Sequence, residues 1–129
     1  MEIITGIKGH SEVQVDETNV ACAMGSGSLP VFATPALAAA MENAALNSVQ
    51  PYLDEGYTTV GIRLELDHVA STPTGMTVVT DSELIAVEGK ILSFRIESRA
   101  GDEVVGTALH KRCIVAGERF LKKAEAKRG

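Results

Sequence analysis

Residues 34–49 read TPALAAAMENAALNSV, and this stretch decides which fold the chain can adopt. Threonine is a favourable helix N-cap, and proline is tolerated in the first turn because its missing N–H would be unpaired there. The pattern predicts a helix that begins at Thr34-Pro35, covers 36–49 and ends before Pro51 and Gly56. One face of this helix carries Leu37, Met41, Ala44, Ala45 and Ser48. Because small side chains surround it on nearly all sides, we expect a buried central helix that a sheet approaches closely.

Strand patterns flank this helix on both sides. Long strands are expected at 57–68, 76–87, 90–100 and 103–116, and shorter ones at 9–15 and 19–24. Turn residues at 72–75, 88–89 and 100–102 predict consecutive hairpins and therefore an antiparallel meander. A long helix on one face of such a sheet is an α+β fold. The charged segment 118–128 predicts a short, solvated helix.

Composition narrows the class of protein. The chain has 129 residues and 45% hydrophobic content, which fits one domain over 1–129 with a real core. Its net charge of −5 argues against a nucleic-acid partner, and no apolar run is long enough to span a membrane. The first ten residues lack a signal-peptide pattern. Cys22 and Cys113 stand far apart without metal-site spacing, so we expect free thiols in a cytoplasmic protein.

The strand 57–68 positions the first candidate functional residue. Side chains alternate across a strand, so one face of this strand is apolar and the other is charged. The apolar face carries Ile62, Leu64 and Leu66, and is expected to meet the helix. His68 continues this alternation at the end of the strand. We therefore expect the His68 side chain to point toward the helix.

Glu42 interrupts the alanine-rich helix and is the second candidate. Either it lies on the one exposed stripe of the helix, or it is a partly buried carboxylate that faces His68, each group shifting the pKa of the other. A solvated stripe would normally carry further Lys and Glu residues at helical spacing. The alanine-rich surroundings therefore favour the partly buried carboxylate.

Thr34 has a structural role as N-cap that does not exclude a functional one. Thr34 and Glu42 are eight positions apart, which corresponds to about 12 Å along a regular helix. The two residues cannot touch within one straight helix. Either the chain around Thr34-Pro35 is not yet helical, or a site is assembled across a dimer interface. The long strands, which leave an edge or a face to be covered, also favour a dimer.

The remaining candidates carry weaker signals. His110 and Arg112 share one face of the last predicted strand, where His110 is interpreted as a surface or core-edge histidine. His10 receives no role. The chain has no zinc-ligand spacing, no Walker loop, no dinucleotide fingerprint and no Gly-X-Ser-X-Gly turn.

Three segments together resemble a known family. The stretch 29–37, followed by Met41-Glu42, is similar to the start of the helix in the fluoroacetyl-CoA thioesterase-like branch of the hot-dog thioesterases. Gly61 with 66–75 resembles the second signature of that branch, and His110-Lys-Arg112 resembles its His-x-Arg segment. The resemblance extends from about Gly9 to Phe120.

The resemblance implies a hot-dog fold, in which an antiparallel sheet wraps a long helix, and a homodimer or a larger assembly built from it. It implies hydrolysis of an acyl-CoA thioester, with neither a metal nor a redox cofactor. By position, Thr34, Glu42 and His68 match the catalytic residues of the family. Gly61 and Arg112 match positions that help to place the thioester and the attacking water.

One segment departs from the family pattern. Aromatic residues cover the acyl group in the fluoroacetyl-specific member, whereas this chain has Gly25-Ser-Gly-Ser28 there and keeps only Phe32 nearby as a substrate contact. We therefore expect a thioesterase of open acyl preference. A non-catalytic acyl-CoA-binding module is the alternative, since fold does not fix function. A hot-dog hydratase is a third reading, but its usual signatures are not evident.

The phosphates of CoA call for basic side chains. A basic cluster lies near the C-terminus, at Lys111, Arg112, Arg119, Lys122 and Lys123. The part of this cluster in 118–128 is interpreted as the face of a solvated helix.

Overall fold

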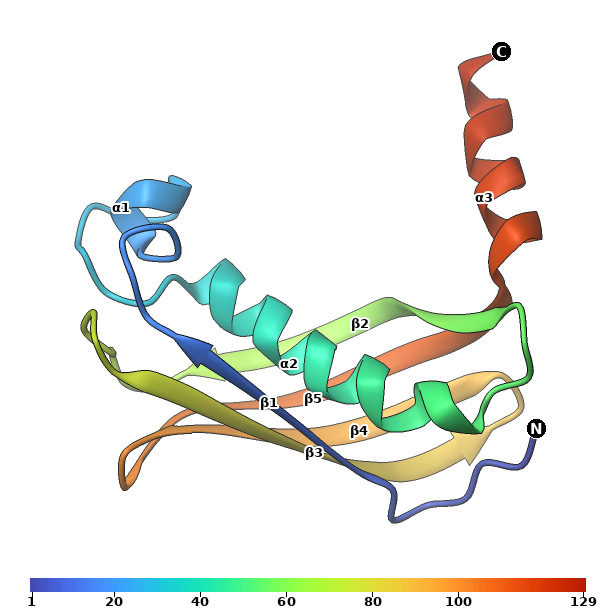
Figure 1. Cartoon of the computed structure of the whole chain (residues 1–129), viewed down its shortest axis with the longest axis horizontal. Coiled ribbons are helices and arrows are strands. Elements are labelled where there is room, and N and C mark those ends of the chain that lie inside the picture. The colour runs from blue at the N-terminus through green and yellow to red at the C-terminus, as the bar shows by residue number, and fades with distance from the viewer.

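The computed structural model describes all residues from 1 to 129. The strands are β1 (Lys8–Gln14), β2 (Tyr57–His68), β3 (Thr77–Glu88), β4 (Ile91–Ala100) and β5 (Glu103–Ala116). The helices are α1 (Ala21–Met24), α2 (Thr34–Val49), η1 (Gln50–Tyr52), α3 (Gly117–Glu125) and η2 (Ala126–Arg128). The five strands form one antiparallel sheet that curves around α2 (Figure 1), so the predicted α+β architecture is confirmed.

The order of strands in the sheet is β1-β3-β4-β5-β2. The hairpins β3–β4 and β4–β5 were predicted from their turns, but the expected pairing of β2 with β3 is wrong. Both sides of β3 are occupied, by β1 and β4, so β2 pairs with the free side of β5 instead. The segment 69–76 is therefore a connection across the end of the sheet rather than a hairpin turn. β2 forms one edge of the sheet.

Helix α2 lies across the inner face of the sheet (Figure 1). The five residues predicted to face the core are all buried: Leu37, Met41, Ala44, Ala45 and Ser48. A Cβ added to Gly106 on β5 would lie 2.8 Å from Cδ2 of Leu37, which shows how closely the sheet backbone approaches the helix. The small side chains of α2 thus allow the close packing that the sequence predicted.

Residues 19–24 do not form the predicted second strand. Val20 makes only an isolated bridge to Phe32, and 21–24 form the short helix α1. Gly25 ends this helix in a left-handed conformation with φ of 75°, which glycine adopts without steric cost. The strand prediction for 19–24 is therefore wrong, because these residues form one helical turn that Gly25 terminates.

Strand β2 does not alternate strictly along its length. Its pairing with β5 shifts register between Gly61 and Arg63, which marks a β-bulge. Leu64, Leu66 and His68 face the helix as predicted, but Ile62 is 52% exposed. The prediction for Ile62 is wrong because the bulge inserts one residue and reverses the alternation at that point.

Helix α3 leaves the end of β5 and points away from the sheet (Figure 1). None of its residues is buried, and Phe120 and Leu121 are exposed. This agrees with the predicted solvated helix. None of the helices combines the length and the hydropathy that crossing a membrane requires.

Candidate active site

Thr34 and His68 form the first group of candidate residues. The hydroxyl oxygen of Thr34 lies 2.8 Å from Nδ1 of His68. Thr34 is the first residue of α2 and Ala33 is the N-cap, so the predicted capping role of Thr34 is wrong. Its hydroxyl group makes no capping hydrogen bond and binds the histidine instead. The end of β2 and the start of α2 therefore meet through these two side chains.

The environment of His68 favours its neutral form. Burial lowers the pKa of His68, and the nearby backbone of Ala70 opposes this shift. The Nε2 atom is buried and makes no hydrogen bond. A neutral imidazole next to a hydroxyl group can accept its proton, which is the arrangement needed for proton transfer.

Glu42 belongs to a second group, in the middle of α2. Its Oε2 atom lies 3.8 Å from Nη1 of Arg112, and its side chain is 44% exposed while that of Arg112 is 7% exposed. A Cβ added to Gly61 would lie 2.7 Å from the same carboxylate oxygen. Glu42 is thus a half-exposed carboxylate that sits over a glycine of β2, next to a buried guanidinium group.

Arg112 is held by Thr59, which the sequence did not single out, and by His110. Its Nε atom donates to the hydroxyl oxygen of Thr59 at 2.8 Å, and Nη2 donates to the carbonyl oxygen of Thr59 at 3.0 Å. Its Nη1 atom lies 3.1 Å from Nε2 of His110. Burial lowers the pKa of Arg112, and Glu42 opposes this shift by Coulombic attraction. A charged group this buried needs such partners to remain in place.

The role of His110 was underestimated from sequence. Only the shared face of His110 and Arg112 was recognised, and both side chains are indeed buried and in contact. Thr59 was missed because its contact depends on the pairing of β2 with β5, which no local pattern encodes. The sequence offered one signal for the contact between His110 and Arg112: the two residues are two positions apart on the last strand and therefore share a face.

The two groups lie apart within one chain. Helix α2 is continuous from Thr34 to Val49, so Thr34 and Glu42 are about 12 Å apart along it. Gly61, beside Glu42, and His68 are seven residues apart on β2, or roughly 20 Å. The predicted contact between Glu42 and His68 therefore does not form within one chain. The possibility that Thr34 precedes the helix is excluded as well.

A cavity of about 320 Å³ adjoins the Thr34–His68 pair. Apart from these two residues its lining consists of small or apolar side chains: Ala21, Ser26, Val31, Phe32, Val69, Ala70 and Ser71. Phe32 is only 1% exposed and packs in the hydrophobic core. It therefore forms part of the wall of the cavity and cannot act as a mobile cover over it.

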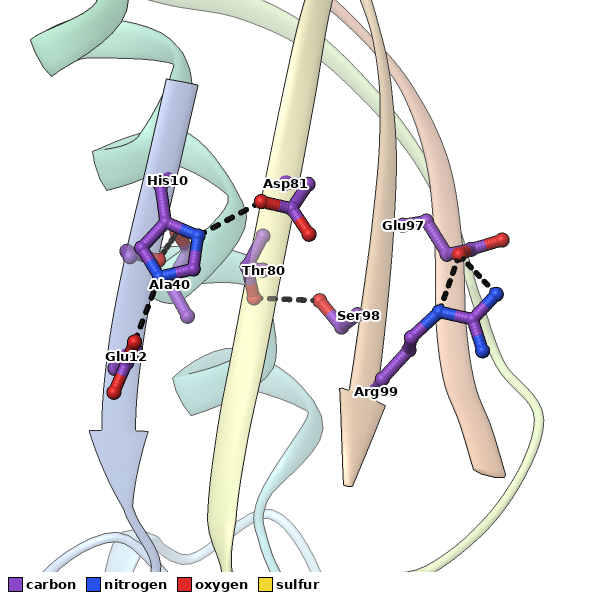
Figure 2. A network of polar contacts seen from close by, with 9 residues as sticks. His10, Glu12, Ala40, Thr80, Asp81, Glu97, Ser98 and Arg99 are labelled. Carbon is purple, nitrogen blue, oxygen red and sulfur yellow. Dashed lines mark hydrogen bonds and ion pairs between the residues drawn. The ribbon is translucent and has the colours of Figure 1, made fainter. Parts of the chain in front are cut away.

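The outer face of the sheet carries a separate polar network (Figure 2). His10 lies between Asp81, at 2.8 Å, and Glu12, at 2.7 Å. These hydrogen bonds raise the pKa of His10, with that to Asp81 contributing most. Thr80 and Ser98 bond to each other at 2.7 Å in the buried layer between the sheet and the helix. None of these residues reaches either group of candidates.

The outer face also has a groove of about 460 Å³ lined mostly by charged side chains. Glu83 pairs there with Lys8, at 3.8 Å, and with Arg95, at 3.4 Å. The groove lies across the sheet from α2 and none of the candidate residues lines it. The cavity beside Thr34 and His68 adjoins two of the candidate residues.

The fold and the position of these groups define the class of protein. A long helix wrapped by a sheet of order β1-β3-β4-β5-β2 is the hot-dog fold. A hot-dog-like protein from Thermanaerovibrio acidaminovorans matches with a TM-score of 0.87 at 22% identity, covering 97% of this chain and 93% of its own. The chain is therefore a hot-dog protein with one group of polar side chains at the start of α2 and another at its middle.

The comparisons also identify the family. The model of the family described as "FlK: Fluoroacetyl-CoA-specific thioesterase" matches residues 15–118, and the fluoroacetyl-CoA thioesterase of Streptantibioticus cattleyicolor is 36% identical over 97 residues, 75% of this chain and 70% of its own. A structure of the fluoroacetyl-CoA thioesterase FlK has a TM-score of 0.91 at 28% identity and covers 98% of both chains. The chain belongs to the fluoroacetyl-CoA-specific thioesterase family. The prediction of an enzyme of the thioester-hydrolase class is confirmed by this membership.

Proposed function

We propose that this protein hydrolyses acyl-CoA thioesters, with Thr34, Glu42 and His68 as its catalytic residues. The observation that carries the proposal is the position of the Glu42 carboxylate, half-exposed over Gly61 and 3.8 Å from the buried Arg112. A related structure holds a variant of FlK with fluoroacetate and CoA, at 28% identity and a TM-score of 0.86, covering 92% of this chain and 99% of its own. That relative supports a CoA thioester as substrate here.

The chemistry follows from the two groups. Glu42 either attacks the thioester carbonyl, giving an anhydride that water then hydrolyses, or activates a water molecule that attacks the carbonyl itself. Arg112 and the backbone at Gly61 offer hydrogen-bond donors to the oxyanion that develops. Thr34 and His68 form a hydroxyl–imidazole pair that can transfer a proton to the leaving thiolate. The free acid and CoA are then the products.

These roles require a second copy of the chain, because the two groups are far apart within one. Strand β2 is an edge strand whose outer side carries unpaired backbone groups, a surface suited to pairing. Antiparallel pairing of two β2 strands about a two-fold axis at Glu65, with Ile62 as the extra residue of the bulge, would place His68 of the partner subunit opposite Gly61. Neighbouring strands lie about 4.8 Å apart, so His68 of the partner subunit would then reach Glu42. We propose a homodimer with two such composite sites.

Mixing two inactive variants tests the composite site. Glu42→Ala and His68→Ala chains are unfolded together, refolded and assayed for thiol release. A mixed dimer retains one intact site, so random pairing should restore about a quarter of the wild-type activity. If each site lay within one chain, both sites of the mixed dimer would be defective and the mixture would remain inactive.

The acyl preference is tested with a panel of substrates. The loop 25–28 is exposed and carries no aromatic side chain, and small residues line the cavity beside it. We propose that fluoroacetyl-CoA is not preferred over acetyl-CoA. Comparing kcat/KM for the two, and for longer acyl chains, decides this; a strong preference for fluoroacetyl-CoA would contradict it.

An acyl-CoA-binding module without activity, the alternative expected from the sequence, is the outcome that would contradict this function. It would bind acyl-CoA in calorimetry but release no thiol above background from any member of the panel.

We further propose that 1–129 acts as one domain in the cytoplasm. The free thiol of Cys22 is exposed, which suits a reducing compartment.

A further inference from the structure

We propose that His110 is a positioning residue, which holds the guanidinium group of Arg112 in place beside Glu42. This inference rests on the proposed function for its catalytic consequence. It depends on two hydrogen bonds, from His110 to the backbone of β2 and from Arg112 to His110, and on the ion pair of 3.8 Å between Arg112 and Glu42.

The partners of His110 determine which nitrogen carries its proton. Nδ1 lies 2.7 Å from the carbonyl oxygen of Arg63, which can only accept, so Nδ1 must donate. Nε2 lies 3.1 Å from Nη1 of Arg112, which can only donate, so Nε2 must accept. Both conditions are met only by a neutral imidazole protonated at Nδ1. The bulge of β2, where Arg63 lies, therefore fixes the tautomer of His110.

The tautomer of His110 gives Arg112 a third hydrogen-bond acceptor. Thr59 accepts from Nε and from Nη2, and His110 accepts from Nη1. These three bonds fix the plane of the guanidinium group. The N–H of Nη1 that His110 does not use is then left for Glu42, whose Oε2 lies 3.8 Å away. His110 thus determines the direction in which Nη1 of Arg112 presents its second N–H.

The surroundings of His110 keep it neutral. Its side chain is 2% exposed, and the ring of Phe94 packs at a centroid distance of 6.2 Å. Burial lowers the pKa of His110; the hydrogen bond to Arg63 and the charge of Glu42 oppose this, while the charge of Arg112 adds to it. Arg112 on β5 and Glu42 on α2 are the charged groups that act on it. A protonated His110 would place two cations in contact and could no longer accept from Arg112.

The first experiment uses the wild-type protein and needs no substrate. Long-range ¹H–¹⁵N NMR spectra report the protonation state of each imidazole nitrogen at neutral pH. The expected result is a neutral His110 with its proton on Nδ1 and a slowly exchanging Nε–H signal for Arg112. A proton on Nε2, or a cationic ring, would overturn the proposal.

The second experiment compares His110→Leu with His110→Gln. Leucine fills the buried space without an acceptor, whereas the amide of glutamine keeps both an acceptor and a donor. We expect kcat for thiol release to fall about 10²-fold in His110→Leu, the loss typical of a 1 Å misplacement, with KM changed only a few-fold. His110→Gln should recover most of kcat and the Arg112 Nε–H signal.

A matched control separates positioning from simple loss of a buried hydrogen bond. Ser98→Ala removes the buried bond to Thr80 on the neighbouring strands, away from Arg112, and should lower the melting temperature without changing kcat. A folded His110→Leu protein with wild-type kcat would overturn the proposal, as would a His110→Gln protein as impaired as His110→Leu. If His110→Leu does not fold, the proposal is tested by the tautomer of His110 in the wild type, which must carry its proton on Nδ1. If the wild type hydrolyses no thioester, the proposed function is wrong. The NMR spectra then still test whether His110 accepts a hydrogen bond from Arg112.

Discussion

Replacing Gly61 with alanine tests whether the position of Glu42 is essential for activity. The added Cβ would lie 2.7 Å from Oε2 of Glu42, and ordinary contact begins at 3.4 Å, so the carboxylate must retreat by about 0.7 Å. Since a 1 Å misplacement of a reacting group can cost 10²-fold in rate, we expect kcat/KM to fall 10- to 100-fold. This corresponds to about 1.4–2.7 kcal/mol of transition-state stabilisation.

The same substitution should leave stability almost unchanged. The atom that must move most is the end of a flexible side chain that is 44% exposed, and Cε1 of the buried His110, at 3.3 Å, must give by only about 0.1 Å, so little packing is lost. Gly61 does not have a positive φ, so alanine fits its backbone conformation and restricts the unfolded chain, which contributes roughly 0.4–1 kcal/mol of stability. The expected result is a large loss of activity with a melting temperature close to that of the wild type.

Two other glycines provide controls. Gly106→Ala would place its Cβ 2.8 Å from Cδ2 of Leu37 and 3.1 Å from Cε of Met41, both buried, so it should cost about 1–3 kcal/mol of stability while the folded enzyme keeps its kcat. Gly117→Ala meets only ordinary contacts, so it should leave kcat unchanged and add roughly 0.4–1 kcal/mol of stability. The assay is thiol release beside thermal unfolding. A Gly61→Ala protein with wild-type kcat/KM would refute the reasoning, because Glu42 would then act from another position.

Three further predictions concern the other groups of the site. Glu42→Gln should reduce kcat by about 10²–10⁴ in the thiol-release assay and hardly change thermal unfolding, because it removes the carboxylate but keeps the shape of a half-exposed side chain. Thr34→Val should lower kcat about fivefold or more by removing the bond to Nδ1 of His68, while Thr34→Ser should retain activity; equal rates for the two variants would contradict this. Burial lowers the pKa values of His68 and His110, so at acidic pH the unfolded chain binds protons that the folded chain does not. The contribution of these two histidines to the free energy of unfolding is therefore full above pH 6.5 and falls as the pH drops from there toward the folded-state pKa values. Denaturant titrations at a series of pH values measure this fall. His110→Gln should make that fall shallower, and an unchanged slope would show that His110 is not the source.

The local parts of the fold could be predicted from the sequence. The buried face of α2 follows from helical spacing, and the bounds of β2 and β5 follow from their strand patterns, because each depends on residues close together in the chain. The order of the strands depends instead on which edges remain free once the hairpins have formed. The place of β2 beside β5, and the short helix at 21–24, were therefore beyond local patterns.

In the candidate site, too, the contacts that depend on local patterns could be predicted and those that depend on strand pairing could not. Strand alternation correctly directed His68 toward α2, but the residue that it meets there is Thr34 and not the expected Glu42. It gave no indication of Thr59, which reaches Arg112 only because β2 and β5 pair in a particular register. It also assigned His110 the role of a surface or core-edge histidine, because the partners of a histidine on a strand depend on which strand lies beside it.

The bulge in β2 explains why both groups of the site face the helix. Gly61 and His68 are seven positions apart, an odd number, so strict alternation would turn them to opposite faces of the sheet. The register shift between Gly61 and Arg63 adds one residue and brings both to the face that meets α2. The same shift sets the Arg63 carbonyl against Nδ1 of His110. One irregularity in an edge strand thus orients both groups, and two such strands paired about their centre would bring the groups of different subunits together.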